Sequence, residues 1–344
     1  MQTKPIAPNS KAPVISVVIP LYNKAPYIRR TIQTVLEQSF QDIEIVIVDD
    51  GSTDGGGVIV QEMDNARCRL YCQPNAGKSA ARNKGVELAR SDLIAFLDAD
   101  DEWHPEFLAA SLALHQRWPD IVGSLINYER SDIHQAALPR NVAAGPLESY
   151  FRFCLANGGS GMWTGAVMVR KKPLLEAGGF PLGSKMGEDL DTWFRLACQG
   201  PIAYEPRPLA EYFCDRGICS TSKVDCDIWP TFQSWKRAGR IPKKELRAAE
   251  QFAAVLRLIT VAMRCREGDV ASARRMMSEL PLGRAWSARR VACWLAAWVP
   301  VFPPRYWLGL ADRMGVPIYW KASQERAWTV NRMAAAQPVT GGKP

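Results

Sequence analysis

The chain has 344 residues, of which 47% are hydrophobic and 23% charged, an ordinary globular balance with room for two domains or one domain with an appendage. Its nine cysteines form no CxxC pair, which argues against a disulfide framework or a zinc knuckle and fits reduced thiols in a cytosol. The presence of only three histidines argues against a histidine-based metal site, and the polar N-terminus lacks the apolar core of a signal peptide. A cytoplasmic location is therefore expected.

The net charge of +8 is unevenly distributed. Residues 1–233 hold 23 Lys and Arg against 28 Asp and Glu, whereas residues 234–344 hold 20 against 7. Such asymmetry is typical of a nucleic-acid or anionic-membrane surface. No recognition helix or RNA-binding motif is found, so nucleic acid is not an expected partner.

Residues 284–328 are rich in Trp and Arg. Lys and Arg near an anionic bilayer contribute about 1 kcal/mol each, and Trp favours the interface. The apolar run at 291–299 is too short to span a bilayer. We therefore expect either a peripheral contact with an anionic membrane through 284–328, or a helical appendage with Trp in its core and Arg in solvent.

The first hundred residues alternate between strand and helix patterns. Runs of β-branched residues predict strands, and apolar residues three or four apart predict helices. In chain order the predicted elements are a strand at 14–19, a helix at 27–38, a strand at 43–48, a helix at 56–64, a strand at 69–71, a helix at 78–89 and a strand at 94–97.

This alternation predicts βαβ units. The expected fold is α/β, with a Rossmann-like, mostly parallel central sheet flanked by helices. Two further helices are expected over 243–280, broken near Gly268, with Asp269 capping the second. These helices predict an α-helical C-terminal extension.

Polar residues follow three of the predicted strands, at 20–23, 49–52 and 98–101. Ligands of open α/β sheets bind beyond the carboxyl ends of the strands. If the three strands are neighbours, their ends line one cleft.

The third of these strand ends holds Asp98, Asp100 and Asp101 directly after an apolar run. Unpaired carboxylates are costly to bury, so the acids are expected at the tip of a core strand, facing a cleft. Clustered carboxylates suit a hard divalent cation, and such a cation suits a diphosphate. A solvated acidic turn is the alternative.

Five segments occur in an order that resembles family 2 glycosyltransferases: 16–24, 48–54, 75–83, 97–101 and 187–195. The resemblance covers roughly residues 14–220. It implies a nucleotide-sugar-binding fold of the A type and transfer of a sugar from a nucleoside diphosphate, with inversion.

The resemblance assigns Pro20 and Tyr22 to the nucleoside base, with Tyr22 stacked on the ring or flanking it. Asp50, with Asp49, would accept a hydrogen bond from a base NH, which favours uracil or guanine and makes UDP the expected donor nucleotide. The alternatives are a core aromatic at Tyr22 and turn chemistry at the two acids before Gly51.

The diphosphate end is assigned to four residues. Lys78 and Arg82 share one helical face and would lie near the diphosphate, unless they form a solvated face. Asp100 would bind Mn²⁺ or Mg²⁺ directly, and Asp98 would contact the ribose or the metal through water. Asp101 is expected to cap the next segment.

The general base of the resembled family corresponds to the acidic motif at 187–191. Asp189 is the first choice, Glu188 the neighbour and second choice, and Asp191 the third. Adjacent residues on a helix point in different directions, so Glu188 and Asp189 are not expected to share one role. Acids favoured by a helix dipole are the alternative reading.

Trp163 follows a Gly-rich segment and is read either as a stacking platform for a sugar or as a packing residue. The QxxRW-type motif and transmembrane helices of processive family members are not found in the sequence. We therefore expect a hexosyltransferase that adds one sugar, or few, per encounter to a glycan or lipid-linked acceptor. A non-catalytic sugar-nucleotide-binding protein and a nucleotidyltransferase are the alternatives.

The expected domain organisation has four parts: a flexible tail at 1–13, a nucleotide-sugar-binding catalytic domain at 14–225, a helical basic region at 226–333 and a disordered tail at 334–344.

Overall fold

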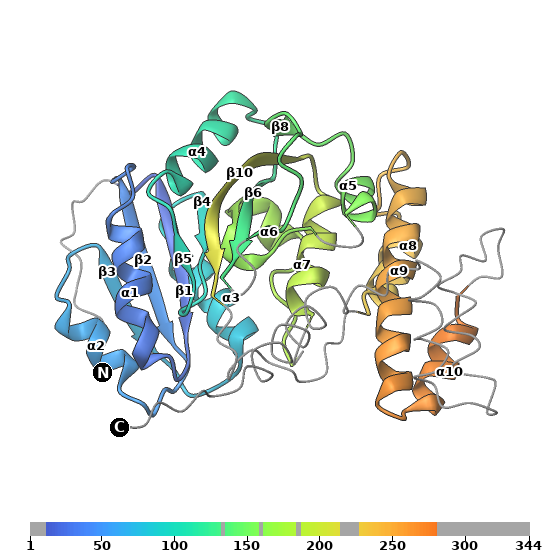
Figure 1. Cartoon of the computed structure of the whole chain (residues 1–344), viewed down its shortest axis with the longest axis horizontal. Helices are drawn as coiled ribbons and strands as arrows, with labels where there is room; N and C mark the ends of the chain where they lie inside the picture. The colour runs from blue at the N-terminus through green and yellow to red at the C-terminus, as the bar shows by residue number, and fades with distance from the viewer. Residues whose placement is uncertain (1–11, 132–134, 158–160, 184–186, 214–226, 281–344) are drawn as a thin grey trace, which may run out of the picture. The chain divides into compact units, whose positions relative to one another are not determined.

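The computed structural model describes residues 12–131, 135–157, 161–183, 187–213 and 227–280 (Figure 1). The Trp-rich segment 284–328 and the predicted tail at 334–344 lie outside the described residues. The chain divides into two compact units, residues 1–253 and 254–344. The domain boundaries predicted at residues 13, 225 and 333 stay predictions.

The first unit is built on one sheet with the strand order β3-β2-β1-β4-β9-β6-β10-β5. Short strands β7 and β8 pair with β6 and β10. The strands are β1 (Ile15–Leu21), β2 (Ile43–Asp49), β3 (Cys68–Cys72), β4 (Leu93–Phe96), β5 (Glu102–Trp103), β6 (Gly123–Arg130), β7 (Gln135–Ala136), β8 (Gly145–Pro146), β9 (Val167–Arg170) and β10 (Ile202–Tyr212).

The predicted α/β class is confirmed, and the sheet has a parallel part and a mixed part. Strands β3, β2, β1 and β4 are parallel. Strand β9 is antiparallel to both β4 and β6, and β6 and β10 are parallel to each other. Parallel pairing over the first four strands follows from the helical crossovers between them, which return the chain to the same edge of the sheet.

Helices connect and cover these strands. They are α1 (Ala25–Leu36), α2 (Gly56–Glu62), α3 (Lys78–Leu88), α4 (Phe107–Arg117), α5 (Tyr150–Ala156), the 3-10 helix η1 (Thr164–Ala166), α6 (Lys171–Glu176), α7 (Glu188–Ala197), α8 (Trp229–Arg237), α9 (Leu246–Arg266) and α10 (Val270–Ser278). Helix α1 begins two residues before the predicted start, because Pro26 is tolerated in its first turn.

Helices α1 and α3 cover opposite faces of the parallel strands. Val17 and Ile19 of β1 share a buried cluster with Ile28 of α1, whereas Val46 and Val48 of β2 share another with Ala81 of α3. Side chains alternate between the two faces of a strand, so the two helices lie on opposite sides of the sheet. Figure 1 shows α1 in front of β1 and β2.

Helix α3 approaches β1 closely at Gly85. A Cβ atom built on Gly85 would lie 2.2 Å from Cγ1 of Val18, so only glycine permits this separation. The loop before α3 follows β3, which places the start of the helix at the carboxyl edge of the sheet.

The C-terminal helices were also predicted. Helix α9 runs across the division between the two units and α10 lies in the second. The Asp269 carboxylate accepts a hydrogen bond from the backbone N of Ser272 at 3.1 Å, which caps α10 as predicted. Among the described residues, none of the helices has the length and apolar character needed to cross a membrane.

Candidate active site

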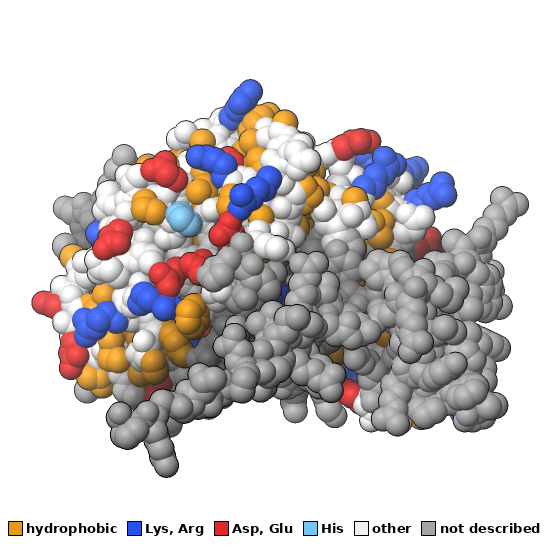
Figure 2. Space-filling view, viewed as in Figure 1, with side chains coloured by type: hydrophobic (Ala, Val, Ile, Leu, Met, Phe, Trp, Pro, Cys, Tyr) orange, Lys and Arg blue, Asp and Glu red, His pale blue; other side chains and the backbone are white. Residues whose placement is uncertain are grey.

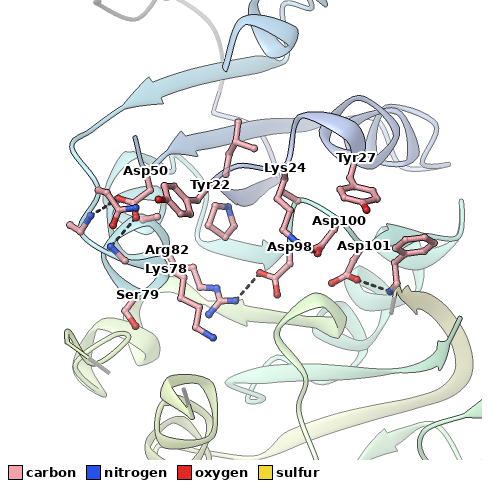
Figure 3. A pocket seen from close by; sticks show the side chains of 18 of the residues that line it. Tyr22, Lys24, Tyr27, Asp50, Lys78, Ser79, Arg82, Asp98, Asp100 and Asp101 are labelled. Carbon is pink, nitrogen blue, oxygen red and sulfur yellow. Dashed lines mark hydrogen bonds and ion pairs between the residues drawn. The ribbon is translucent and has the colours of Figure 1, made fainter. Parts of the chain in front are cut away.

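A cleft of about 820 Å³ opens at the carboxyl ends of β1, β2 and β4 (Figure 3). Helix α3 supplies one wall and the end of β10 another. The described residues that line it are Pro20, Leu21, Tyr22, Lys24, Tyr27, Asp50, Asn75, Ala76, Gly77, Lys78, Ser79, Ala81, Arg82, Asp98, Ala99, Asp100, Asp101, Gly183, Tyr212 and Phe213.

The cleft brings together most of the predicted donor-site residues. Strand β1 lies between β2 and β4, so the three polar strand ends are neighbours. The predicted residues that line the cleft are Pro20, Tyr22, Asp50, Lys78, Arg82, Asp98 and Asp100. The predicted residues outside this lining are Asp49, Glu188 and Asp189.

Tyr22 and Asp50 lie at one end of the cleft (Figure 3). Tyr22 is 49% exposed, whereas Asp50 is 2% exposed. The Asp50 carboxylate accepts hydrogen bonds from the backbone N of Ala76 at 2.9 Å, the backbone N of Gly77 at 2.8 Å and Nε2 of Gln73 at 2.7 Å. Asp50 therefore holds the loop before α3 against the end of β2.

Asp49 shapes the turn after β2. Its Oδ1 accepts a hydrogen bond from the backbone N of Ser52 at 2.9 Å. A Cβ atom on Gly57 would lie 2.5 Å from Oδ2 of the same carboxylate. Asp49 is buried, and these contacts match the turn chemistry that the sequence left as an alternative.

Arg82 is 3% exposed and bridges two carboxylates. Its Nη2 lies 2.7 Å from Oδ1 of Asp98, and its Nη1 lies 2.8 Å from Oε1 of Glu188. Burial disfavours the ionised form of Asp98, but the Arg82 guanidinium outweighs it and lowers the pKa of that carboxyl. Arg82, which was predicted to lie near the diphosphate, is therefore already paired with Asp98 and Glu188.

Lys78 lies one turn before Arg82 on α3. Its Nζ lies 2.7 Å from Oε1 of Glu188, and its side chain is more exposed than that of Arg82. Two cations therefore converge on Glu188, which is 1% exposed. Figure 3 shows Lys78 and Arg82 side by side below Asp50.

Asp101 links the third strand end to β10. Its Oδ1 accepts a hydrogen bond from the backbone N of Phe213 at 2.8 Å, and its buried Oδ2 has no hydrogen-bond partner among the described residues. Burial and then the charges of Asp98 and Asp100 raise the pKa of Asp101 well above its usual range. The acid predicted to cap the next segment instead holds the far wall of the cleft.

The chemistry of this corner fits a divalent cation. Carboxylate oxygens are the ligands that Mg²⁺ and Mn²⁺ prefer. The buried Oδ2 atom of Asp101 has no hydrogen-bond partner among the described residues, which leaves one carboxylate oxygen of this corner unsatisfied. Among the described residues, however, no group of three or more His, Cys, Asp or Glu has the arrangement of a metal site, so Asp98 and Asp100 are the remaining candidate ligands.

Asp189 lies in the first turn of α7, next to Glu188. Burial and then the charge of Glu188 raise the pKa of Asp189, although Arg82 and Lys78 oppose the shift. Asp191 differs, because its carboxylate accepts hydrogen bonds from Nε of Arg195 at 2.7 Å and from Oγ1 of Thr231. The third-choice base is therefore bound within the packing around α7.

Trp163 is half-buried and packs between two other rings. Its centroid lies 4.8 Å from that of Tyr128 and 5.2 Å from that of Tyr212. It is not among the residues that line the cleft. These contacts favour the packing role; residues 158–160 of the same loop lie outside the described chain.

Sequence reasoning missed four charged or aromatic residues of the cleft lining: Lys24, Tyr27, Tyr212 and Phe213. Lys24 directly follows the first polar strand end, and Tyr27 lies three residues further on. Their closeness to that strand end was the sequence signal that could have identified them. Tyr212 and Phe213 carry no local motif, because they reach the cleft only through the pairing of β10 with β6 and β5.

The crystal structure of S. aureus TarS 1–349 in complex with UDP-GlcNAc aligns with this chain at a TM-score of 0.70, covering 88% of this chain and 92% of that one. The sequence identity is 18%, so this likeness shows the fold alone.

Sequence comparison adds the family. The model of "Glycosyl transferase family 2" matches residues 16–177. An uncharacterised glycosyltransferase of Nostoc is 38% identical over 135 residues, covering 38% of this chain and less than half, 42%, of that protein. The putative teichuronic acid biosynthesis glycosyltransferase TuaG of Bacillus subtilis is 42% identical over 216 residues, covering 61% of this chain and 83% of TuaG. On this match and the family model, the chain belongs to glycosyltransferase family 2.

Proposed function

We propose that this glycosyltransferase moves one sugar from a UDP donor to an acceptor hydroxyl, with inversion and with the help of Mn²⁺ or Mg²⁺. The observation that carries the proposal is the cleft, which has Tyr22 and Asp50 at one end and Asp98 and Asp100 at the other. The UDP and UDP-GlcNAc complexes of TarS support a UDP donor. The name of TuaG, a putative teichuronic acid biosynthesis glycosyltransferase, supports a role in polysaccharide biosynthesis. The acceptor would be a surface polysaccharide or a lipid-linked oligosaccharide.

The donor would lie along the cleft with its base beside Tyr22 and Pro20. A base NH would share the Asp50 carboxylate with the loop amides that already bond to it. Lys78 keeps a half-exposed ammonium near the middle of the cleft, where it suits an anionic phosphate. The buried Arg82 stabilises the same region through its ion pairs with Asp98 and Glu188.

Asp100 and Asp98 are the residues that would hold the cation, which supplies positive charge for the leaving nucleoside diphosphate. Lys24 pairs with Asp100, and Arg82 with Asp98. Asp101 keeps Phe213 and the end of β10 against this corner.

Asp189 would act as the general base. Inversion requires removal of the acceptor proton on the face of the sugar opposite the leaving group, and one carboxylate suffices for it. The raised pKa of Asp189 makes its carboxylate a stronger proton acceptor than an ordinary aspartate. Glu188 has a different part, because its two ion pairs fix the start of α7 against α3.

The test is a screen of nucleoside diphosphate sugars for release of the nucleoside diphosphate, with and without Mn²⁺. The substitution Asp100→Asn should abolish cation-dependent donor binding. Asp189→Asn should spare donor binding and lower the transfer rate at least about 100-fold, the usual scale of general-base catalysis.

Asp191→Asn is the matched variant on the same helix. It should keep the transfer rate, because Asp191 is bound to Arg195 and Thr231. Turnover that is independent of metal, or an unimpaired Asp189→Asn enzyme, would overturn the proposed mechanism.

A further inference from the structure

Lys24 forms an ion pair with Oδ2 of Asp100, the candidate cation ligand. The two residues are 76 positions apart in the sequence. Both side chains are about a quarter exposed, at 24% for Lys24 and 26% for Asp100. Figure 3 shows the Lys24 ammonium between Asp98 and Asp100, on the wall of the cleft.

The backbone around Lys24 is fixed from both sides. The backbone N of Asn23 donates to Oγ of Ser52 at 3.1 Å, and Oδ1 of Asn23 accepts from the backbone N of Thr53 at 2.9 Å. The backbone N of Ala25 donates to Oδ2 of Asp54 at 2.7 Å. Any movement of the ammonium therefore comes from the flexible side chain of Lys24.

The cations that line the described cleft divide into two sets. Lys78 and Arg82 are engaged by Glu188, and Arg82 also by Asp98. Lys24 is the lining cation paired with Asp100.

An ammonium and a divalent cation compete for such a corner. Both can bind the Asp100 carboxylate, and their positive charges repel each other. Even in a water-like medium, this repulsion lowers the affinity of the divalent cation about tenfold. A bound diphosphate changes this balance, because it offers the ammonium another anionic partner in the same cleft.

We propose that Lys24 couples cation binding to donor binding: its ammonium holds Asp100 in the free enzyme and transfers to the diphosphate when a cation takes that carboxylate. This inference rests on the proposed metal-dependent function. The cation then binds weakly to the free enzyme and tightly with the donor nucleotide, and by linkage the nucleotide gains the same factor from the cation.

The test measures Mn²⁺ binding from the free-Mn²⁺ paramagnetic resonance signal, with and without UDP, and needs no turnover. For the wild type, UDP should strengthen Mn²⁺ binding at least about tenfold. Lys24→Met should bind Mn²⁺ alone about tenfold more tightly than the wild type, and UDP should add much less. Lys24→Arg, which keeps the charge, should behave as the wild type.

Lys78→Met is the matched control, because it also removes an ammonium from the cleft but one that is paired with Glu188. Its affinity for Mn²⁺ alone should rise less than that of Lys24→Met. Lys24→Gln serves as a second neutral variant, and thermal melting of each variant establishes that it is folded.

The inference fails if Lys24→Met and Lys24→Gln bind Mn²⁺ as the wild type does, or gain no more than Lys78→Met, while UDP still strengthens wild-type binding. If Mn²⁺ binds to none of the proteins, even with UDP, the proposed metal dependence itself fails and the inference falls with it.

Discussion

Two adjacent acids at the start of α7 have different surroundings and so different chemistry. Glu188 is paired with Lys78 and Arg82, whereas Asp189 bonds to the backbone N of its neighbour Leu190 at 2.8 Å. Different surroundings of this kind allow one site to assign separate roles to two carboxylates. The sequence predicted both acids, but the ion pairs that separate their roles come from another helix.

This difference gives a pH prediction for the transfer rate. Burial and the charge of Glu188 raise the pKa of Asp189 above its ordinary value of 3.8. The base acts when ionised, so the rate should rise with pH through a midpoint above that value. Because the Lys78 ammonium lowers the pKa of Asp189, removal of that charge in Lys78→Met should move the midpoint to higher pH.

The measurement is the pH profile of the transfer rate at saturating donor. Lys84→Met is the control on the same helix, since Lys84 pairs with the exposed Glu87 at 2.9 Å. An identical midpoint for wild type and Lys78→Met would contradict the electrostatic link between α3 and Asp189.

Some residues of the site could be placed from the sequence, and others could not. Pro20, Asp50 and Asp98 lie within two residues of the ends of predicted strands, so their place at one edge of the sheet followed from the sequence pattern. Contacts across long separations did not follow: Asp101 binds the backbone N of Phe213, 112 residues later. Phe213 follows β10, and the sequence of β10 carries no local signal that it pairs with β6 and β5.

At the scale of elements, the close approach of α3 to β1 determines where the wall of the cleft lies. Gly85→Ala would drive a Cβ atom into Val18, at 2.2 Å from Cγ1. Overpacking of this kind costs about 1–3 kcal/mol, set against about 1 kcal/mol gained from the helix propensity of alanine. We therefore expect a net loss of about 1 kcal/mol in the free energy of unfolding.

Val18→Ala removes the two methyl groups that the new Cβ would meet. The double variant should be more stable than the sum of the two single losses predicts, by about 1 kcal/mol. Urea denaturation of the four proteins measures this coupling. Strict additivity would mean that the helix shifts away from the strand instead of overpacking.

The elements of the first hundred residues were the most predictable part of the fold. Regular alternation of β-branched strands and amphipathic helices gave β1, α1, β2, α3 and β4 within a few residues of their bounds. Antiparallel β9, which lies between β4 and β6, was not predicted, because strand order depends on contacts between distant segments and leaves no local periodicity.

At the scale of the whole molecule, the described residues account for only part of the uneven charge distribution along the chain. Side chains of both signs are scattered over the face seen in Figure 2. Yet residues 234–344 hold 20 of the 43 Lys and Arg and only 7 of the 35 Asp and Glu. Much of that excess falls on residues beyond 280, outside the described chain.

We expect the 344-residue chain to bind anionic membranes through this basic region. The protein should co-float with vesicles that contain anionic lipid at low salt, and most of it should leave them at about 0.5 M salt because screening weakens the attraction. Vesicles of neutral lipid are the control. Absence of co-flotation at low salt would favour the helical appendage as the reading of the Trp-rich segment.

Arg82 has a consequence for attempts to recombine members of this family. Its guanidinium joins Asp98, 16 residues later, to Glu188, 106 residues later, and the family match at 16–177 ends between those two acids. A chimera that joined residues 16–177 of this chain to the following segment of another family member would inherit the arginine from one parent and its second carboxylate from the other. Exchange of the segment after residue 177 therefore requires an acid at position 188 in the incoming sequence, or the buried arginine loses one of its two partners.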